Sequence, residues 1–417
     1  MKIGGLSDDV AGLREQLADV YRDLHQHPEL SLHEHRTAQR ILEYLAGLDY
    51  DVTANVGGTG VVALLRNGAG PTVMVRADID ALPVEEKTGL PYASTIRAQD
   101  DSGHEVPVAH ACGHDMHATC LLGAAAVLAG WKDRWSGTLL LVFQPAEELT
   151  RGAHDMIADG LFTRFPVPQV VLAQHVAPLP AGSIGYRGGP FMAASDTADV
   201  TLYGRGGHGS RPEATIDPVV MAANVVTRLQ SIVSREVPAD QVAVVTVGRL
   251  RAGSKDNVIP ATAELGINIR TYADHVRDIV RTAVERIVRA EATASGAVRD
   301  PDIEWTNSAP VLVNDVAAMA RTAAAFSDYF GAQRVFEMPA VAASEDAGVF
   351  GSAISVPTVY WMWGGMDYAR LNGDLAALPV NHSPEFAPEI EPTLTTGVEA
   401  LVVAALLWLS ADAWQKQ

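Results

Sequence analysis

The densest cluster of metal-ligand residue types in the chain is the run HACGHDMH at positions 110–117. A thiolate at Cys112 and an imidazole at His114, two residues apart in a glycine-containing turn, can both reach ions above a helix start. Sulfur and nitrogen ligands suit zinc or its neighbours. Each residue alone is explained as simply by a buried cysteine or a surface histidine. Four such residues within eight positions indicate a metal site.

A pair of adjacent carboxylates, Glu147 and Glu148, follows the apolar run 138–143 through the tripeptide QPA. The pair therefore comes at the end of a predicted strand, and open α/β sheets gather ligand sites at that edge. A dication nearby would relieve the repulsion between the two acids. One of the two acids can then bind metal while the other stays free to take a proton from water. A solvated loop is the simpler alternative.

Two further histidines complete a candidate ligand set. His175 ends the apolar run 170–174, and His382 lies in the polar loop NHSPEF at 381–386. Each alone could be a packed or an exposed histidine without a function. Together, five groups can hold two divalent ions with one group bridging, an arrangement that suits hydrolysis: Cys112, His114, Glu148, His175 and His382. Zinc fits these ligands, and manganese and cobalt bind similar sites.

A glycine-rich loop, GRGGHGSRP at 204–212, formally matches the dinucleotide-binding fingerprint. This match underlies the alternative of a nicotinamide-dependent oxidoreductase. The true fingerprint opens a helix whose N–H groups meet a pyrophosphate, whereas here the helix is expected only from Asp217 onward. We therefore interpret His208 as a catalytic donor that the loop brings to a cleft, with a flexible loop as the alternative. Asn257 and Arg270, which flank a strand of the same region, can bind a substrate carboxylate.

The elements expected around these residues form two groups, as the length of 417 residues also suggests. Apolar strands alternate with helices in the first part, which predicts an α/β fold whose central, mostly parallel mixed sheet has helices on both faces. From residue 190 the expected order is strand 196–203, helix 217–235, strand 242–250, strand 259–271, helix 274–294 and strand 302–306. That order is βαββαβ, a ferredoxin-like unit.

The predicted organisation is therefore a small domain inserted into a larger one. A catalytic metal-binding domain spans 1–189 and resumes at 309–417, and an inserted lid or dimerisation domain spans 190–308. Within the second catalytic segment, residues 354–363 predict a strand despite Pro357. The stretch 401–411 is too short to cross a bilayer and predicts a buried helix.

Net charge, the N-terminal run and the cysteine content bear on the partners and the location of the protein. The net charge of −19 argues against nucleic acid as a partner and gives no attraction to an anionic membrane. The N-terminal run MKIGGLSDDVAGLREQL has no apolar stretch, so no secretory signal is expected. The two cysteines, Cys112 and Cys120, give no disulfide framework, which predicts a cytoplasmic enzyme.

Taken together, the motifs resemble the amidohydrolase branch of the two-metal metallopeptidases: auxin-conjugate hydrolases, hippurate hydrolases and bacterial N-acyl-amino-acid aminoacylases. The matching segments span nearly the whole chain: HQHPELS (25–31), RADIDALP (76–83), HACGHDMH (110–117), QPAEE (144–148), QHV (174–176), GRGGHGSRP (204–212), NVIP (257–260) and NHSPEF (381–386). Ser344-Glu345-Asp346 also matches a family segment, without an assigned role.

The resemblance implies a role for each candidate. Cys112 takes the place of a bridging Asp of related peptidases, and the other ligands are His114, Glu148, His175 and His382. Glu147 is the base, and His208 is similar to a lid histidine that stabilises the tetrahedral oxyanion, often across a dimer. Asn257 and Arg270 match positions that hold the carboxylate side of the substrate. Asp78 stands where related peptidases have a metal-binding His, so Asp78 and Asp80 are predicted to orient the ligands.

The predicted activity is metal-dependent hydrolysis of the amide bond of N-acyl amino acids, with two divalent ions per subunit. The resemblance also implies a homodimer formed through the inserted domain. Apolar residues such as Trp361 and Met362 are candidates for an acyl pocket. Within hydrolases, the alternatives are a dipeptidase and an N-acetyl-diamino-acid deacetylase. Outside them, the alternatives are the oxidoreductase and a binding protein with a structural metal.

Overall fold

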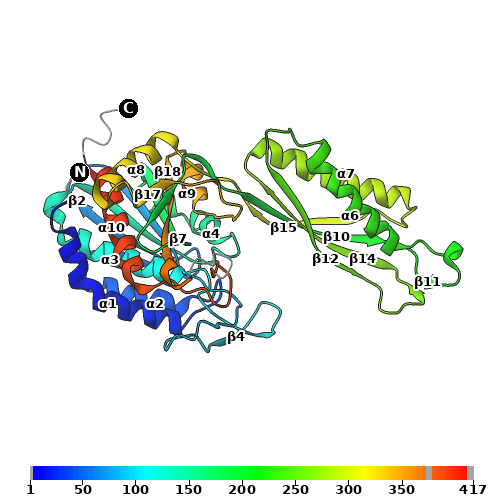
Figure 1. Cartoon of the computed structure of the whole chain (residues 1–417), viewed down its shortest axis with the longest axis horizontal. Coiled ribbons are helices and arrows are strands. Elements are labelled where there is room, and N and C mark those ends of the chain that lie inside the picture. The colour runs from blue at the N-terminus through cyan, green and yellow to red at the C-terminus, as the bar shows by residue number, and fades with distance from the viewer. Residues whose placement is uncertain (1–2, 372–377, 411–417) are drawn as a thin grey trace. The chain divides into compact units, whose positions relative to one another are not determined.

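Separate hydrophobic cores divide the protein into two units in the computed structural model, which describes residues 3–371 and 378–410 (Figure 1). Unit 1 comprises Met1–Gly189, Val313–Pro339 and Asp346–Gln417. Unit 2 comprises Pro190–Leu312 and Ala340–Glu345. The sequence predicted a single inserted segment, at 190–308. In the structure, unit 2 also contains a second segment, residues 340–345.

Unit 1 is built on an eight-stranded mixed sheet. The central strands β6, β3, β7 and β18 are parallel to one another, while β1, β2 and β6 pair antiparallel. The sheet confirms the predicted α/β class. Its strands, in sheet order, are β1 (Asp51–Val56), β2 (Gly60–Asn67), β6 (Gly137–Gln144), β3 (Thr72–Asp78), β7 (Val170–Pro180), β18 (Thr358–Met366), β8 (Ile184–Tyr186) and β17 (Val335–Glu337).

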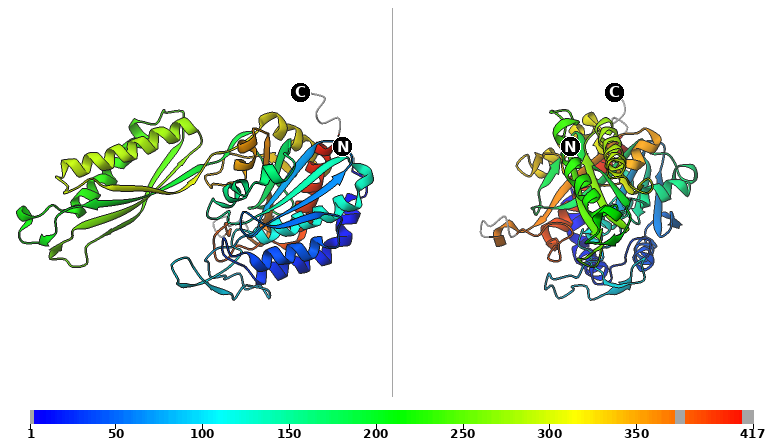
Figure 2. Two further views of the ribbon diagram at one scale, coloured as in Figure 1. Left: turned by 180° about the vertical axis from the view of Figure 1, so that it is seen from behind. Right: turned by 90° about the vertical axis from the view of Figure 1, so that its right-hand side faces the viewer.

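Helices cover both faces of this sheet because alternate strand residues point to opposite faces. In β2, Val61 packs in the main core, whereas Val62 packs in a smaller core on the other face. The main core receives residues from α1 (Leu6–Gln26), α2 (His35–Leu45), α3 (His114–Gly130), α8 (Val316–Phe330) and α10 (Ile390–Leu409). The smaller core receives α4 (Gly152–Ala158), α5 (Leu161–Arg164) and α9 (Gly348–Ile354). Figure 2 shows the strands from behind.

The apolar C-terminal stretch forms α10, which confirms the predicted buried helix. By length and composition α10 could cross a membrane, but 83% of its most apolar window is buried inside the structure. A mostly buried helix of this kind is what the core of a globular unit requires. Ala411, the last residue of the stretch, lies outside the described residues.

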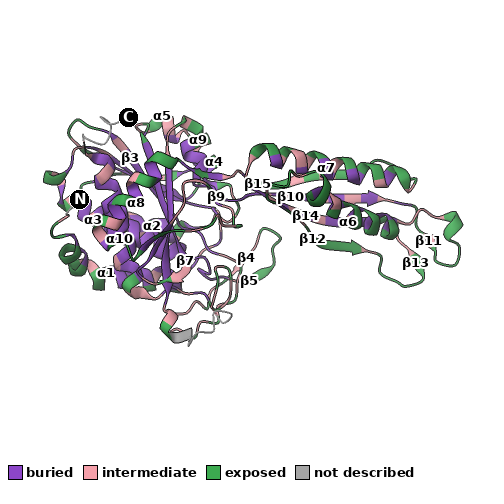
Figure 3. Cartoon of the chain, turned by 45° about the horizontal axis from the view of Figure 1, so that its top comes forward, coloured by how far each residue is buried: buried purple, intermediate pink, exposed green. Residues whose placement is uncertain are grey.

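Unit 2 has the predicted βαββαβ order: β10 (Ala194–Tyr203), α6 (Pro218–Arg235), β12 (Ala243–Ala252), β14 (Thr262–Thr271), α7 (Asp274–Ala294) and β15 (Asp302–Ala309). The strands form an antiparallel sheet in the order β12-β14-β10-β15. Helix α6 begins where Asp217 accepts a hydrogen bond from Val219 N and Pro218 takes the first helical position. Buried and exposed residues alternate along β14, so one face of the sheet packs on the helices (Figure 3).

Two strands begin later than predicted, in each case after a proline. The expected strand 259–271 is broken at Pro260, which has no N–H to donate. Its first residues form β13 (Val258–Ile259), which pairs with β11 (Gly207–His208) instead. The expected strand 354–363 begins only after Pro357, as β18, because Ile354 ends helix α9. The remaining strands are β4 (Arg97–Gln99), β5 (Glu105–Pro107), β9 (Gly189–Met192) and β16 (Leu312–Asn314).

Candidate metal centre

A glycine turn sets the position of the first two candidate ligands. Gly113 has φ +85° and lies between Cys112 and the first residue of α3, His114. A Cβ at Gly113 would lie 2.4 Å from Val176 Cγ1, so both the backbone conformation and the space require glycine. Helix α3 therefore begins at His114, directly after this turn.

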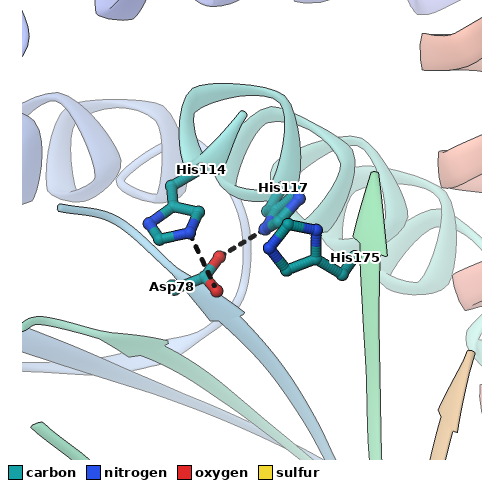
Figure 4. A group of neighbouring side chains, drawn as sticks. All are labelled: Asp78, His114, His117 and His175. Atoms are coloured by element: carbon teal, nitrogen blue, oxygen red, sulfur yellow. Dashed lines mark hydrogen bonds and ion pairs between the residues drawn. The ribbon is translucent and has the colours of Figure 1, made fainter. Parts of the chain in front are cut away.

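The described side chains of unit 1 include overlapping groups that could hold metal ions, with ligand atoms within 4.8 Å of one another. Cys112, Glu148 and His382 form one group, and His114, Glu147 and Glu148 form another. A third, shown in Figure 4, combines residues from β3, α3 and β7: Asp78, His114, His117 and His175. The structure thus brings together the five predicted ligands and the predicted base. His117 is an addition that the sequence reasoning missed, although its place three residues after His114 puts both on one face of α3.

Hydrogen bonds fix which ring nitrogen of two histidines can face an ion. His175 Nδ1 lies 2.7 Å from the Val176 carbonyl oxygen, which can only accept, so Nδ1 carries the proton and Nε2 is left with its lone pair. Nε2 lies 3.4 Å from Cys112 Sγ. His114 Nδ1 lies 3.0 Å from Asp80 Oδ1, and its Nε2 points toward the acidic group. A carboxylate or carbonyl behind a histidine is the usual arrangement for a metal ligand.

Asp80 connects several parts of the group. Besides the His114 ring, it accepts hydrogen bonds from the Ser31 hydroxyl (2.6 Å) and from Glu148 N (3.0 Å). Glu34, buried below the same loop, accepts a bond of 2.9 Å from Ala146 N, next to Glu147. These contacts hold the loop that carries both glutamates against the end of β3.

His382, the predicted C-terminal ligand, is held by its neighbours. His382 N donates to the Ala111 carbonyl oxygen (2.7 Å), and Asn381 Nδ2 donates to the carbonyl oxygens of Cys112 and Val176, each at 3.2 Å. His382 Nε2 lies 3.4 Å from Glu148 Oε2, and 55% of its side chain is exposed. It is therefore the solvent-facing member of the group.

The electrostatics of the group favour an added positive charge. Burial alone would lower the pKa of His114, but the charges of Asp78 and Asp80 outweigh it and raise this pKa to about 10. Burial, followed by the charges of Glu148 and Glu147, raises the pKa of the Cys112 thiol well above its ordinary value. Divalent ions would supply the missing positive charge and allow both residues to bind in their deprotonated forms.

Two buried polar atoms point to the same conclusion. His114 Nε2 and Glu148 Oε1 have no hydrogen-bond partner within residues 3–371 and 378–410. Leaving such atoms unsatisfied is costly, and metal coordination would satisfy both. The donor set of one thiolate, imidazole nitrogens and a carboxylate matches zinc and related ions. The residues present therefore fit a divalent metal centre.

The other predicted site residues belong to unit 2. His208, exposed on β11, pairs with Val258, which follows Asn257. Ser210 N donates to His208 Nδ1 at 3.1 Å. Arg270 on β14 donates from Nη1 to the Ala342 carbonyl and the Ser344 hydroxyl, both at 3.2 Å.

The predicted acyl pocket is not formed by Trp361. This side chain is fully buried in the main core, where its Nε1 donates to Gln174 Oε1 at 3.0 Å and its ring packs on Phe326. Met362 is also buried. Every residue of β18 is buried, as expected for a parallel strand that is covered on both faces.

A model of the Peptidase family M20/M25/M40 matches residues 74–405. The chain belongs to this family. It is 36% identical over 303 residues to N-acetylcysteine deacetylase of Bacillus subtilis, covering 72% of this chain and 76% of that protein. It is 36% identical over 350 residues to hippurate hydrolase of Campylobacter jejuni, covering 83% and 87%. The solved YXEP protein of Bacillus subtilis, a dinuclear metal binding peptidase from the M20 family, aligns with a TM-score of 0.75 and 28% identity, covering 96% and 99%.

Membership of the M20 family confirms the prediction of a metal-dependent hydrolase and gives no support to the oxidoreductase alternative. The loop 204–212 that suggested a nucleotide site instead forms the short strand β11. A dinuclear centre agrees with the M20 relative and with the buried ligand groups.

A buried ion pair supports the first turn of α3 through Asp115. His25 lies 2.6 Å from Asp115 Oδ2 and 3.0 Å from Glu86 Oε1, and its side chain is 1% exposed. Burial would lower the pKa of His25, but Asp115 and Glu86 raise it to about 10. The loop that carries Glu86 also reaches the His382 loop, because Lys87 N donates to the Pro384 carbonyl oxygen at 2.7 Å.

The Gly113 turn predicts a strong effect of one methyl group. Gly113→Ala should reduce the free energy of unfolding by about 1–3 kcal/mol through backbone strain and overpacking against Val176, and it should weaken metal binding. Gly130→Ala, at the end of the same helix with nothing within 4 Å of a new Cβ, is the matched control and should be neutral or slightly stabilising. Urea unfolding measures the stability of both variants, and metal titration measures their metal affinity. Equal stability and equal affinity of the two variants would contradict a special requirement for glycine at position 113.

The His25 pair predicts a pH-dependent stability difference. His25→Ala leaves Asp115 and Glu86 without their cation. The substitution should therefore lower the free energy of unfolding by about 3–5 kcal/mol near pH 6. The pKa of His25 is raised on folding, so its contribution is complete below about 6.5 and is lost as pH rises through about 10. Urea unfolding of both proteins from pH 6 to 10 should show the difference shrinking. A constant difference would argue against a charged His25; exposed His154→Ala is the control.

Proposed function

We propose that this protein hydrolyses the amide bond of N-acyl amino acids and releases a carboxylic acid and a free amino acid. The observation that carries the proposal is the buried acid Glu147 beside a group of thiolate, imidazole and carboxylate ligands. Support comes from relatives named N-acetylcysteine deacetylase, hippurate hydrolase and, at 38% identity over 279 residues, N-acyl-L-amino acid amidohydrolase of Geobacillus stearothermophilus.

The chemistry follows from the positions of the residues. When bound, two divalent ions would lower the pKa of water and draw charge from a carbonyl oxygen. Cys112, Glu148 and His382 would hold them on one side, and His114 and His175 on the other. Glu147 takes the proton of the attacking water and later gives it to the leaving nitrogen. Its carboxylate lies 3.8 Å from His114 Nε2, so it adjoins the ligands.

We propose zinc as the native metal, because a thiolate and imidazoles are ligands that zinc prefers. Manganese and cobalt are the alternatives, and elemental analysis of protein purified without added metal distinguishes them. We also propose a cytoplasmic location, which both cysteines support because they are buried and free.

We assign the oxyanion contact to His208 and the carboxylate contact to Asn257 and Arg270, following the resemblance. The hydrogen bond from Ser210 N occupies His208 Nδ1, so the ring proton is on Nε2 and can be donated to an oxyanion. The guanidinium of Arg270 can present Nη2, which has no partner within the described residues, to a substrate carboxylate.

Removing the base should abolish turnover without removing the metal. Glu147→Gln preserves size but cannot take a proton, so kcat should fall by about 100- to 10,000-fold while the metal content per chain stays unchanged. Glu43→Gln, on the exposed surface of α2, is the control. Hydrolysis of N-acetyl, N-benzoyl and long-chain N-acyl amino acids measures the effect. Retained turnover would assign the base elsewhere.

The same substrate panel, extended with dipeptides and N-acetyl-diamino acids, decides among the hydrolase alternatives. We expect N-acyl amino acids to be cleaved with the highest kcat/KM and a chelator to abolish the activity. Preferred cleavage of dipeptides or of the diamino-acid derivatives would replace the proposed substrate class.

We propose a homodimer formed through unit 2. Strand β12 lies at the edge of its sheet and exposes Val244 and Leu250, with Val242 next to it. Apolar edge strands are templates for pairing with another chain. Leu250→Glu should convert a dimer into monomers in sedimentation experiments, whereas Val298→Glu, also exposed on unit 2, should not. A wild-type monomer would contradict the proposal.

A further inference from the structure

His117 is the member of the buried group in Figure 4 that the family resemblance leaves unassigned. It is 1% exposed, and its ring centroid lies 4.4 Å from that of His175. By proximity alone, His117 is a candidate metal ligand as good as His114. The hydrogen bonds of its ring decide otherwise.

Both ring nitrogens of His117 are engaged. Val176 N donates to Nε2 at 2.9 Å, and because a backbone amide can only donate, Nε2 must be the accepting nitrogen. The ring proton is therefore on Nδ1, which donates to Asp78 Oδ1. A metal ligand needs an unprotonated nitrogen with a free lone pair, and neither nitrogen of His117 offers one.

Asp78 is itself fixed from below by a buried arginine. Arg76, with a side chain 0% exposed, donates from Nη1 to Asp78 Oδ2 at 2.9 Å and from Nε to Gln144 Oε1 at 2.7 Å. Its Nη2 lies 3.1 Å from Asp346 Oδ1, and Gln144 Nε2 donates to the same carboxylate. Arg76 is shared between two carboxylates, and the hydrogen bonds of Gln144 complete the network, so its members have well-defined positions. This gives a structural role to Asp346, which the sequence left unassigned.

The backbone of Val176 carries the restraint to the ligands. Its N–H is held by His117, while its carbonyl oxygen accepts from His175 Nδ1 at 2.7 Å and from Asn381 Nδ2 at 3.2 Å. Asn381 precedes His382. One residue of β7 thus orients the His175 ring and anchors the loop of a second ligand.

We propose that His117 is a positioning residue that binds no metal, and that it places His175 and the His382 loop by holding Val176 between Asp78 and the metal centre. The inference rests on the proposed metal site. The hydrogen-bond network of Arg76, Asp78 and His117 then supports ligands on β7 and in the C-terminal loop. No third ion is expected at the group shown in Figure 4.

Two variants separate the two hydrogen bonds of His117. His117→Gln places an amide oxygen near the Nε2 position, where it can accept from Val176 N. His117→Asn places an amide nitrogen near the Nδ1 position, where it can donate to Asp78 but leaves Val176 N unpaired. His154→Gln and His154→Asn, on exposed His154 of α4, are the matched controls.

The readout is zinc affinity and stoichiometry, measured by competition with a chromophoric chelator, together with the absorption spectrum of the cobalt-substituted protein. We expect every variant to bind two ions at saturation with the wild-type cobalt spectrum. We expect His117→Asn to bind one ion about 10- to 100-fold more weakly and His117→Gln to recover most of that loss.

Several results would overturn the inference. Loss of one ion at saturation, or a changed cobalt spectrum, would make His117 a ligand. Equal affinities of the Gln and Asn variants would remove the role of the Val176 bond. If neither variant folds, a crystal structure of the metal-loaded wild type decides: His117 Nε2 about 2.0–2.1 Å from an ion contradicts the inference, and Nε2 bonded to Val176 N supports it. A wild type that binds no divalent ion refutes the proposed function instead.

Discussion

Buried negative charge at one edge of the main sheet is the constraint on which the rest of the structure depends. Asp78 is the last residue of β3 and Asp80 lies two residues beyond it, while Glu147 and Glu148 follow the end of β6. Carboxylates removed from water require compensating charge or hydrogen bonds. Arg76 compensates part of it below the site. Burial and the nearby glutamates raise the pKa of the Cys112 thiol, and Asp78 and Asp80 raise the pKa of the His114 ring. Divalent cations would supply the positive charge that these shifts call for.

The fold explains how residues distant in sequence reach this edge. Strands β6, β3 and β7 are adjacent and parallel, so the segments after their carboxyl ends meet at one place. The helix start after Gly113 adds Cys112 and His114, and the bonds of Asn381 bring the C-terminal loop to the same point. Polar residues near the N-terminus hold the intervening loops, as Ser31 does with Asp80 and Glu34 with Ala146. The candidate metal centre therefore depends on segments from both ends of unit 1.

Sequence patterns predicted the elements, and which side chains meet at the site, better than the individual contacts between them. Strand β6 and the following glutamates were evident because an apolar run ending in a proline is a local signal. The bond from Val176 to His117 was not, since it joins residues 59 positions apart and depends on strand register. The break at Pro260 was missed because the apolar pattern continues on both sides of it. Proline has no backbone N–H to donate, so the strand is interrupted there. Trp361 looked like pocket lining because a fully buried parallel strand shows no alternation to distinguish its faces.

The proposed pair of divalent cations at this edge can be counted directly. Metal-free protein is dialysed to equilibrium against zinc at neutral pH, and elemental analysis gives the number of zinc ions bound per chain. We expect two ions per chain. A value of zero or one would contradict the proposed dinuclear centre.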